Sequence, residues 1–292
     1  DIDWIDYHPA YREMEKIAWG DFQMAAMAHR PGALGWPEVT PAPIKYAFQY
    51  MFAQSEFGIL CPLSVSETSA YHFEWADDPK LKEMFWEGLT SLDFDNRLTG
   101  TQFMTEKAAG SDVGEATLTA VPDGDAWKLY GEKWFCSHAD ADVALLLARP
   151  EGAAAGTKGL GLFAMPRRLE DGSRNSYRIV RLKEKLGTKS MASGEIIFDG
   201  AKAYAVGDVE NGIKQMLRQV NLSRLSHGVR KIPVAGDYRV QDDFGASDEP
   251  YAWDGDELAL AQRTVEAAAT LLKLDAPLLY ARADFLRGDD GG

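Results

Sequence analysis

The sequence predicts an α+β protein: an N-terminal helical domain, a central antiparallel β-sandwich or barrel, and an incomplete C-terminal helical region. Two changes of period support this fold class. Apolar residues recur at helical spacing up to about residue 98, form short alternating segments to about residue 206, and return to helical spacing from Asn211. We therefore expect domains at residues 1–98, 99–206 and 207–292.

The composition narrows the class of protein. The 292-residue chain is 46% hydrophobic and 26% charged, as is usual for a folded protein with a sizeable core. Its net charge of -14 argues against DNA or RNA as a general partner, because an acidic surface repels phosphate backbones. No apolar run reaches the roughly 20 residues of a membrane span, and no secretory signal opens the chain. Cys61 and Cys136 are too far apart for a metal-type pair, so we expect a cytoplasmic protein with no membrane contact and no metal site.

The first 98 residues contain three helical segments. They are residues 8–30, 40–60 and 78–91, and the second has Pro41 and Pro43 at its N-terminal end. We interpret the methionine and aromatic residues of this region as core packing rather than a cofactor-binding box. These residues are Met24, Met27, Tyr46, Phe48, Tyr50, Met51 and Phe52.

The central region has the pattern of short strands. In residues 116–137, apolar and polar side chains alternate on both sides of Pro122-Asp123-Gly124-Asp125, which predicts a hairpin. Further apolar segments punctuated by Gly or Pro follow at residues 142–150, 159–167, 177–182 and 194–206.

The last region begins with an amphipathic helix at residues 211–230. Residues 231–256 are acidic, contain Pro and Gly, and are expected to form loops. A further helix is predicted for residues 256–274, with Asp254 or Asp256 as its cap, and the C-terminal RGDDGG is expected to fray.

The stretch GTQFMTEKAAGSDVG, residues 100–114, has ligand-binding chemistry. It lacks the Gly-Lys-Ser/Thr of a P-loop and the G-x-G-x-x-G of a dinucleotide fingerprint. The small residues Ala108, Ala109 and Gly110 allow backbone amides to approach an anion such as a pyrophosphate, and Thr105 adds a hydroxyl. The alternative interpretation is a polar turn capped by Ser111 and Asp112.

A second stretch, EKWFCSHAD at residues 132–140, supports the ligand-binding interpretation. It places Trp134 and Phe135 beside the hydroxyl of Ser137. A planar heteroaromatic ring needs an apolar face to pack on and a hydrogen-bond donor at its edge.

Together these stretches resemble the flavin motifs of the acyl-CoA dehydrogenase family. FMTEKAAGSDV is similar to the first motif and GEKWFCSHADAD to the second. RLKEKLGTKSMASGEIIFDGA resembles the closing strands of the β-domain, and NGIKQMLRQVNLSRLSHGVR the helix that follows. The forms MTEK and KWFCS, and the start IDYHPAYREM, are most similar to the alkylation-response (AidB-like) branch.

The resemblance implies a helical, β and helical domain order with FAD bound between the domains. It assigns cofactor binding to Phe103, Met104, Thr105, Gly110, Ser111, Phe135, Cys136 and Ser137. The Met104 backbone and the Thr105 hydroxyl are expected to face the flavin pyrimidine edge, and Ser111 the FAD phosphates and the CoA arm. Phe135 is expected to pack on the flavin ring, and Ser137 to bond its reactive nitrogen region.

The resemblance also implies a reaction and partners. The family removes an α-proton from an acyl-CoA thioester with a carboxylate while the β-hydride passes to flavin. Ser111, Asn221 and Arg224 are implied to bind the acyl-CoA substrate. The resemblance allows for an electron-transfer partner protein and for a homo-oligomer.

The match departs from the family at the catalytic base. Where part of the family has Glu before the helix Arg, this chain has Ser223, and no base motif follows Arg230. Glu257 and Glu266 are expected to be surface charges, and residues after 230 to be shortened and divergent. The chain is also expected to begin inside the family's N-terminal domain. Three hypotheses therefore stand: a dehydrogenase, an AidB-like flavoprotein with little dehydrogenase activity, and an inactive fragment.

Three other residues near the motifs have structural interpretations. We expect Glu106 to pair with Lys107 or with a local backbone amide. Cys136 is expected to point into the sheet, and His138 to be a hydrogen-bonding scaffold residue.

Overall fold

A computed structural model describes residues 5–75 and 78–227, and residues 234–235, 247–248, 255, 259 and 263 beyond them. The chain divides into two compact units, residues 1–184 with 188–226 and residues 185–187 with 227–292. In the second unit the structure describes an antiparallel pair of strands, β8 (Val234–Ala235) and β9 (Ser247–Asp248), within the segment predicted to form loops. Most of the predicted helix at 256–274, with Glu257 and Glu266, and the C-terminal RGDDGG lie outside the described residues.

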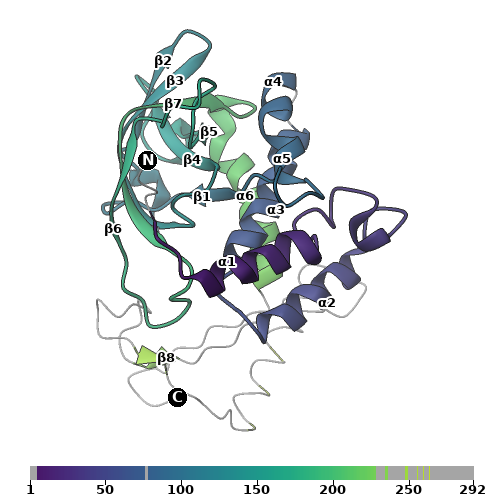
Figure 1. Cartoon of the computed structure of the whole chain (residues 1–292). Coiled ribbons are helices and arrows are strands. Elements are labelled where there is room, and N and C mark those ends of the chain that lie inside the picture. The colour runs from purple at the N-terminus through teal and green to yellow at the C-terminus, as the bar shows by residue number, and fades with distance from the viewer. Residues whose placement is uncertain are drawn as a thin grey trace. The chain divides into compact units, whose positions relative to one another are not determined.

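The first unit begins with helices, as predicted (Figure 1). Their bounds are α1 Pro9–Lys16 with a π-helical turn Ile17–Asp21, α2 Ala42–Ala53, α3 Leu60–Trp75, α4 Pro79–Leu81, and α5 Glu87–Leu89 after the π-helical segment Lys82–Trp86. Pro9, Pro43 and Pro79 stand in the first two positions of their helices, where no intrahelical N–H is lost. Within the described residues, no helix is long and apolar enough to cross a membrane.

Helix α3 is absent from the predicted helices, apart from its first residue. Twelve of its 16 residues are buried, so it has no polar face and shows no helical period in the sequence. Its hydroxyl groups are compatible with burial because they donate to carbonyls: Ser69 to Val65 O at 2.6 Å, and Ser66 to Gly100 O at 3.2 Å.

A buried ion pair links α2 to α3. Lys45 Nζ lies 2.5 Å from Glu67 Oε1, and Gln49 donates to Glu67 Oε2 at 3.2 Å. All three side chains are buried. Neighbouring charges of opposite sign compensate for the loss of water around each group.

The interpretation of the N-terminal methionine and aromatic residues as core is correct only in part. Met24, Met27 and Phe52 are buried in one apolar cluster. Tyr50 and Met51 are 55% and 56% exposed, so the interpretation is wrong for these two. Both lie on the outer face of α2, where the apolar run continues around the helix.

The described part of the first unit contains seven strands, and all but β1 occur where the sequence predicts strands. They are β1 Gly100–Phe103, β2 Thr119–Asp123, β3 Ala126–Ser137, β4 Val143–Pro150, β5 Gly161–Pro166, β6 Tyr177–Leu182 and β7 Ser193–Ala205. The hairpin is confirmed, with Asp123 opposite Ala126. The described connections also contain short 3₁₀ turns at Ala33–Gly35, Val113–Glu115, Thr157–Gly159 and Val209–Asn211.

Five of the strands close into a barrel. The order β4–β2–β3–β7–β5 returns to β4, while β1 pairs with β4 and β6 with β7. Most pairings are antiparallel; β1 and β2 pair with β4 in the parallel sense. The predicted α+β class with a central sandwich or barrel is therefore confirmed.

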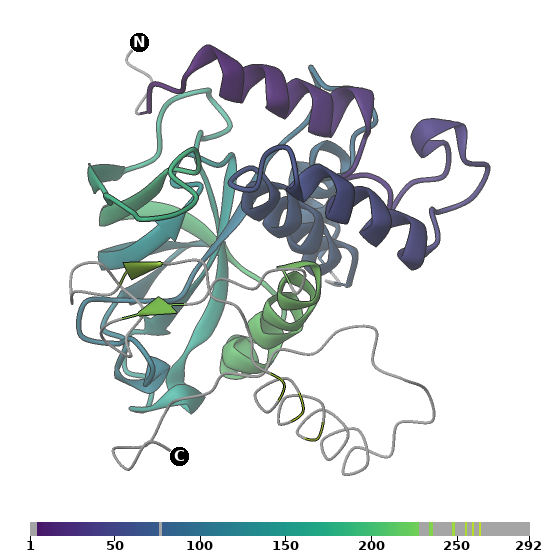
Figure 2. The same ribbon diagram turned by 90° about the horizontal axis from the view of Figure 1, so that it is seen from below.

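Strand β4 separates two cores. Val143, Leu145 and Leu147 face the helices, whereas Ala144 and Leu146 alternate with them and fill the barrel. Burial on both faces explains why this segment is a continuous apolar run. Helices α3 to α5 and α6 (Gly212–His227) pack along the outer face of β4, and the helices lie on one side of the barrel (Figures 1 and 2).

Helix α6 (Gly212–His227) confirms the predicted amphipathic helix. Its inner face carries Met216 and Val220, and Gln219 donates to Ser69 Oγ of α3 at 2.8 Å. The helix begins at Gly212, where a β-carbon would overlap the backbone of Leu160 and Gly161.

We predict that Gly212→Ala lowers the melting temperature by roughly 4–8 °C, because overpacking costs about 1–3 kcal/mol and backbone atoms cannot move aside. Thermal unfolding followed by circular dichroism measures the shift. Gly110→Ala is the matched control, since a β-carbon there meets no atom within 4 Å. Equal melting temperatures for the two variants would contradict the predicted clash.

Candidate flavin site

The two predicted flavin motifs lie next to each other. The Trp134 N–H donates to Thr105 O at 2.8 Å, and Thr101 Oγ1 donates to Ser137 O at 2.6 Å. These bonds join the segment after β1 to the end of β3. Stretches about thirty residues apart in the sequence therefore form one surface.

A β-bulge determines which side chains of β3 reach that surface. Lys133 pairs with Ile196 and Cys136 with Gly194, so β3 has one extra residue between these positions. Lys133 and Cys136 are buried, while Trp134, Phe135 and Ser137 are half-buried. The bulge thus turns two consecutive aromatic residues outward.

The bulge strains the backbone. Phe135 has φ 54° and His138 has φ 52°, in the left-handed region that bulky residues rarely adopt. His138 N–H donates to Ala192 O at 2.8 Å and its carbonyl accepts from Ala141 at 3.0 Å. The expected scaffold role of His138 is therefore carried by its backbone. Such strain is concentrated at functional sites in proteins.

The loop after Thr105 combines a closed turn with an open tip. Glu106 and Ala109 exchange backbone hydrogen bonds of 3.0 and 3.1 Å, whereas Gly110 and Ser111 are exposed. Asp112 accepts from the Gly114 N–H at 3.0 Å, so the capping part of the alternative interpretation is correct for Asp112. That cap leaves Gly110 and Ser111 accessible to a ligand.

A buried ion pair lies beneath this loop. Lys133 Nζ is 2.8 Å from Glu106 Oε1 and donates to Met104 O at 3.0 Å. Both side chains are almost completely inaccessible to solvent. The expectation that Glu106 pairs with Lys107 is wrong, because Glu106 points into the barrel wall rather than toward the exposed Lys107.

Glu106 also accepts hydrogen bonds from backbone amides, the other partner expected for it. Thr117 N–H donates at 2.5 Å, Thr117 Oγ1 at 2.9 Å and Leu118 N–H at 3.1 Å. Burial tends to raise the pKa of Glu106, but the Lys133 ammonium and these donors lower it overall. Burial lowers the pKa of Lys133, and Glu106 opposes that change.

Arg149 holds the far end of the same loop. Its guanidinium donates to Gly114 O at 2.8 Å and Ala116 O at 3.2 Å, and also to Ala154 O and to Gly156 O at 3.1 Å. The loop is thus anchored at both ends, by Glu106 and by Arg149.

The predicted cofactor residues differ in accessibility. Phe103 and Cys136 are buried in the barrel core, and burial raises the pKa of the Cys136 thiol. The orientation expected for Cys136 is confirmed, and the whole residue is inaccessible to solvent. Lys183 Nζ lies 4.1 Å from the centre of the Phe135 ring. The accessible predicted residues are Met104, Thr105, Gly110, Ser111, Phe135 and Ser137.

The predicted substrate residues of α6 form a separate group. Asn221 and Arg224 are exposed on one face of the helix, whereas the adjacent Val220 and Ser223 are buried. Ser223 is buried and its hydroxyl donates to Val220 O at 3.0 Å. Among the described residues, no hydrogen bond or ion pair of Asn221 or Arg224 reaches the flavin motifs.

Lys133 is the residue that the sequence reading missed. It occupies an inward position of β3, two residues from Gly131 and four from Leu129. A charge at such a position needs a buried partner of opposite sign. An acidic residue in a neighbouring apolar segment, here Glu106, is the signal that would have identified the pair.

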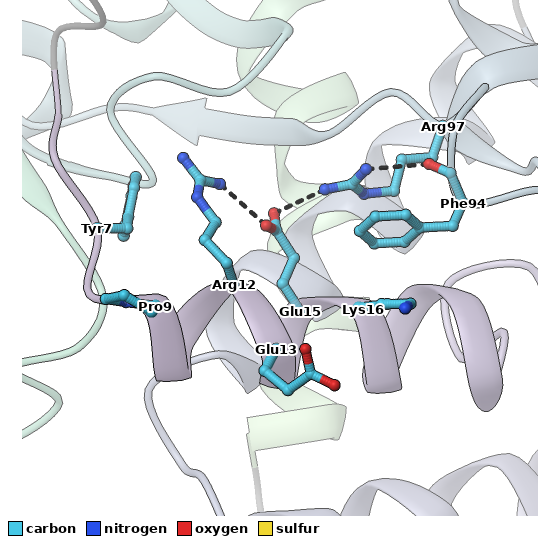
Figure 3. Close-up of a pocket in the computed structure, with 8 residues that line it drawn as sticks. All are labelled: Tyr7, Pro9, Arg12, Glu13, Glu15, Lys16, Phe94 and Arg97. Atoms are coloured by element: carbon cyan, nitrogen blue, oxygen red, sulfur yellow. Dashed lines mark hydrogen bonds and ion pairs between the residues drawn. The ribbon is translucent and has the colours of Figure 1, made fainter.

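An open groove of about 600 Å³ runs along α1 (Figure 3). Arg12 and Arg97 both bond Glu15 there, at 2.9 and 3.0 Å. The groove contains none of the predicted flavin or substrate residues, and its arginines are already paired. In the part of the chain that the structure describes, no group of three or more His, Cys, Asp or Glu could hold a metal.

Two family models match adjacent parts of the chain. Residues 1–96 match the adaptive response protein AidB N-terminal domain, and residues 101–201 match the acyl-CoA dehydrogenase middle domain.

Relatives match most of this chain but less than half of their own length. Acyl-CoA dehydrogenase family member 11 of Caenorhabditis elegans is 34% identical over 77% of this chain and 39% of its own length. Putative acyl-CoA dehydrogenase AidB of Escherichia coli is 34% identical over 76% of this chain and 41% of its own length. The chain thus spans about two fifths of the curated relatives it matches.

A solved structure matches the fold. The crystal structure of Caenorhabditis elegans ACDH-11 in complex with C11-CoA has a TM-score of 0.68 and 30% identity. The match covers 76% of this chain and 38% of that chain.

The Lys133–Glu106 pair predicts acid sensitivity. The pKa of Glu106 is lowered in the folded state. Its charge therefore stabilises the fold above the usual carboxyl pKa, and this stabilisation is lost as the pH falls from that value through the folded-state pKa. Glu106→Gln should cost about 3–5 kcal/mol at pH 7, because it leaves a buried ammonium without its counter-charge. This difference from the parent should narrow as the pH is lowered toward 4, measured by urea unfolding.

The control for this prediction is Glu115→Gln, which changes an exposed carboxylate in the same loop. We expect it to follow the parent within about 0.5 kcal/mol. A Glu106→Gln difference that stays constant across pH would show that the carboxylate charge contributes nothing.

Proposed function

The chain belongs to the acyl-CoA dehydrogenase family, and from this we propose that it is an FAD-dependent, acyl-CoA dehydrogenase-like flavoprotein. One observation carries the proposal: the hydrogen bonds of Thr105 and Lys133 hold the two flavin motifs together. The proposed reaction is α,β-dehydrogenation of an acyl-CoA thioester.

The accessible residues fit a flavin. Thr105 N–H donates no hydrogen bond within the described chain, and a β-carbon on Gly110 would meet no atom within 4 Å. A donor without a partner and an open, small-residue tip suit close approach by a polar ligand. A bound flavin would supply the acceptor for the substrate hydride.

We assign roles to this chain's residues accordingly. Thr105 and the Met104 backbone bind the pyrimidine edge, and Phe135 provides an apolar face for the ring. Ser137 donates a hydrogen bond near the reactive nitrogen. Gly110 and Ser111 bind the phosphates, while Phe103 and Cys136, which are buried, support the site from the barrel core. On α6, Asn221 and Arg224 line the acyl-CoA site together with Ser111.

The base for α-proton removal has no candidate in the matched helix. Ser223 stands at the family's position, is buried, and its hydroxyl donates to Val220 O. It cannot accept an α-proton at neutral pH.

The AidB N-terminal match, together with Ser223 at the family's base position in α6, supports a second candidate function. This is an AidB-like flavoprotein that binds FAD and has little dehydrogenase activity. The net charge of -14 argues against nucleic acid as its partner.

Other features of the function rest on the same family membership. The proposed domains are residues 1–98, 99–206 and 207–292. An electron-transfer protein is the proposed acceptor of the flavin electrons, and a homo-oligomer the proposed assembly. The proposed compartment is the cytoplasm, because two cysteines so far apart in the sequence suit a reducing environment.

We predict that the 292-residue chain retains flavin absorption bands after incubation with FAD and desalting. Anaerobic addition of C11-CoA should then bleach the bands if the chain is a dehydrogenase, and leave them unchanged if it is AidB-like. C11-CoA is the first thioester to test because it occupies the ACDH-11 structure. A colourless protein would refute both candidates.

We also predict that Gly110→Val weakens FAD binding about tenfold, because its side chain occupies the space the phosphates need. Its melting temperature should stay within about 1–2 °C of the parent, since Gly110 is exposed and has no neighbours. Titration of FAD fluorescence measures the affinity. Unchanged affinity would exclude Gly110 from the binding surface.

A further inference from the structure

Two consecutive carbonyl groups of the first flavin motif point toward β3. Met104 O accepts from Lys133 Nζ at 3.0 Å, and Thr105 O accepts from Trp134 N–H at 2.8 Å. No described peptide bond is cis. In a planar trans peptide the N–H points opposite to the C=O. The N–H of Thr105, which shares a peptide with Met104 O, therefore points away from Lys133.

The next peptide shows the same geometry. Its carbonyl, Thr105 O, is bonded to β3, and its N–H, on Glu106, points the other way and donates to Ala109 O at 3.0 Å. The N–H of Thr105 has no equivalent acceptor in the described part of the chain. The Thr105 N–H is therefore a backbone donor with a fixed direction, and Thr105 itself is half-buried.

The charge of Glu106 stabilises the Lys133 ammonium in the position that fixes this direction. The Lys133 side chain is completely buried, so an ammonium there requires a counter-charge within reach. Glu106 supplies it and is itself held by Thr117 and Leu118. The ion pair thus holds the Met104–Thr105 peptide in place against the barrel wall.

We propose that Lys133 and Glu106 are positioning residues for FAD, and that their ion pair aims the Thr105 N–H at the flavin pyrimidine edge. Neither side chain touches the ligand, because both are buried. This inference rests on the proposed function. It goes beyond that function because it states that an ion pair outside the binding surface increases the affinity for FAD.

The test compares FAD binding by the parent, Lys133→Met and Lys45→Met. Lys45 is the matched control, because its pair with Glu67 is also buried but contacts neither flavin motif. Affinity is measured by FAD fluorescence titration at a temperature where circular dichroism shows each variant folded. We expect Lys133→Met to weaken FAD binding about tenfold, the factor that one hydrogen bond supplies, and Lys45→Met less than about twofold.

Hydrogen exchange supplies a readout that a purely structural role would not change. FAD should slow exchange of the Thr105 amide in the parent and in Lys45→Met, but not in Lys133→Met. If Lys133→Met does not fold, Glu106→Gln, which preserves side-chain volume, replaces it with the same expected direction.

The other outcomes overturn the inference. Equal FAD affinity in parent and Lys133→Met removes the positioning role and leaves the proposed function intact. Equal weakening by Lys133→Met and Lys45→Met shows a general loss of stability. A parent that does not bind FAD overturns both the proposed function and the positioning role.

Discussion

The burial of β4 on both faces is the constraint on which the rest of the first unit depends. One face of β4 must be covered by the barrel and the other by helices, so neither layer alone removes the apolar side chains of β4 from water. Helices α3 and α6 supply the outer cover, and they are bonded to each other through Gln219 and Ser69. The candidate flavin site lies where β1, paired with β4, and β3 end next to each other.

The sequence identified β4 as a continuous apolar run and other elements by their period. The β2–β3 hairpin and α6 each have one apolar and one polar face, so their spacing was sufficient. Helix α3 was missed because burial on nearly all sides removes the period. Tyr50 and Met51 were misjudged for the opposite reason: they are apolar, but no element among the described residues covers their face of α2.

The candidate site illustrates a different limit. Motif resemblance located Thr105, Phe135 and Ser137, but no local pattern specifies that Glu106 reaches Lys133 across 27 positions. Long-range pairing depends on strand register, and here the register includes a bulge. The site therefore combines left-handed backbone and buried charge, two features that a stable fold tolerates only where the surrounding contacts are strong.

The two anchors of the loop between Met104 and Leu118 differ in chemistry. Glu106 bonds an ammonium and can be protonated, whereas the hydrogen bonds that the structure gives Arg149 go to neutral carbonyls that do not titrate. In acid, therefore, the end near Glu106 loosens while the end near Arg149 remains fixed.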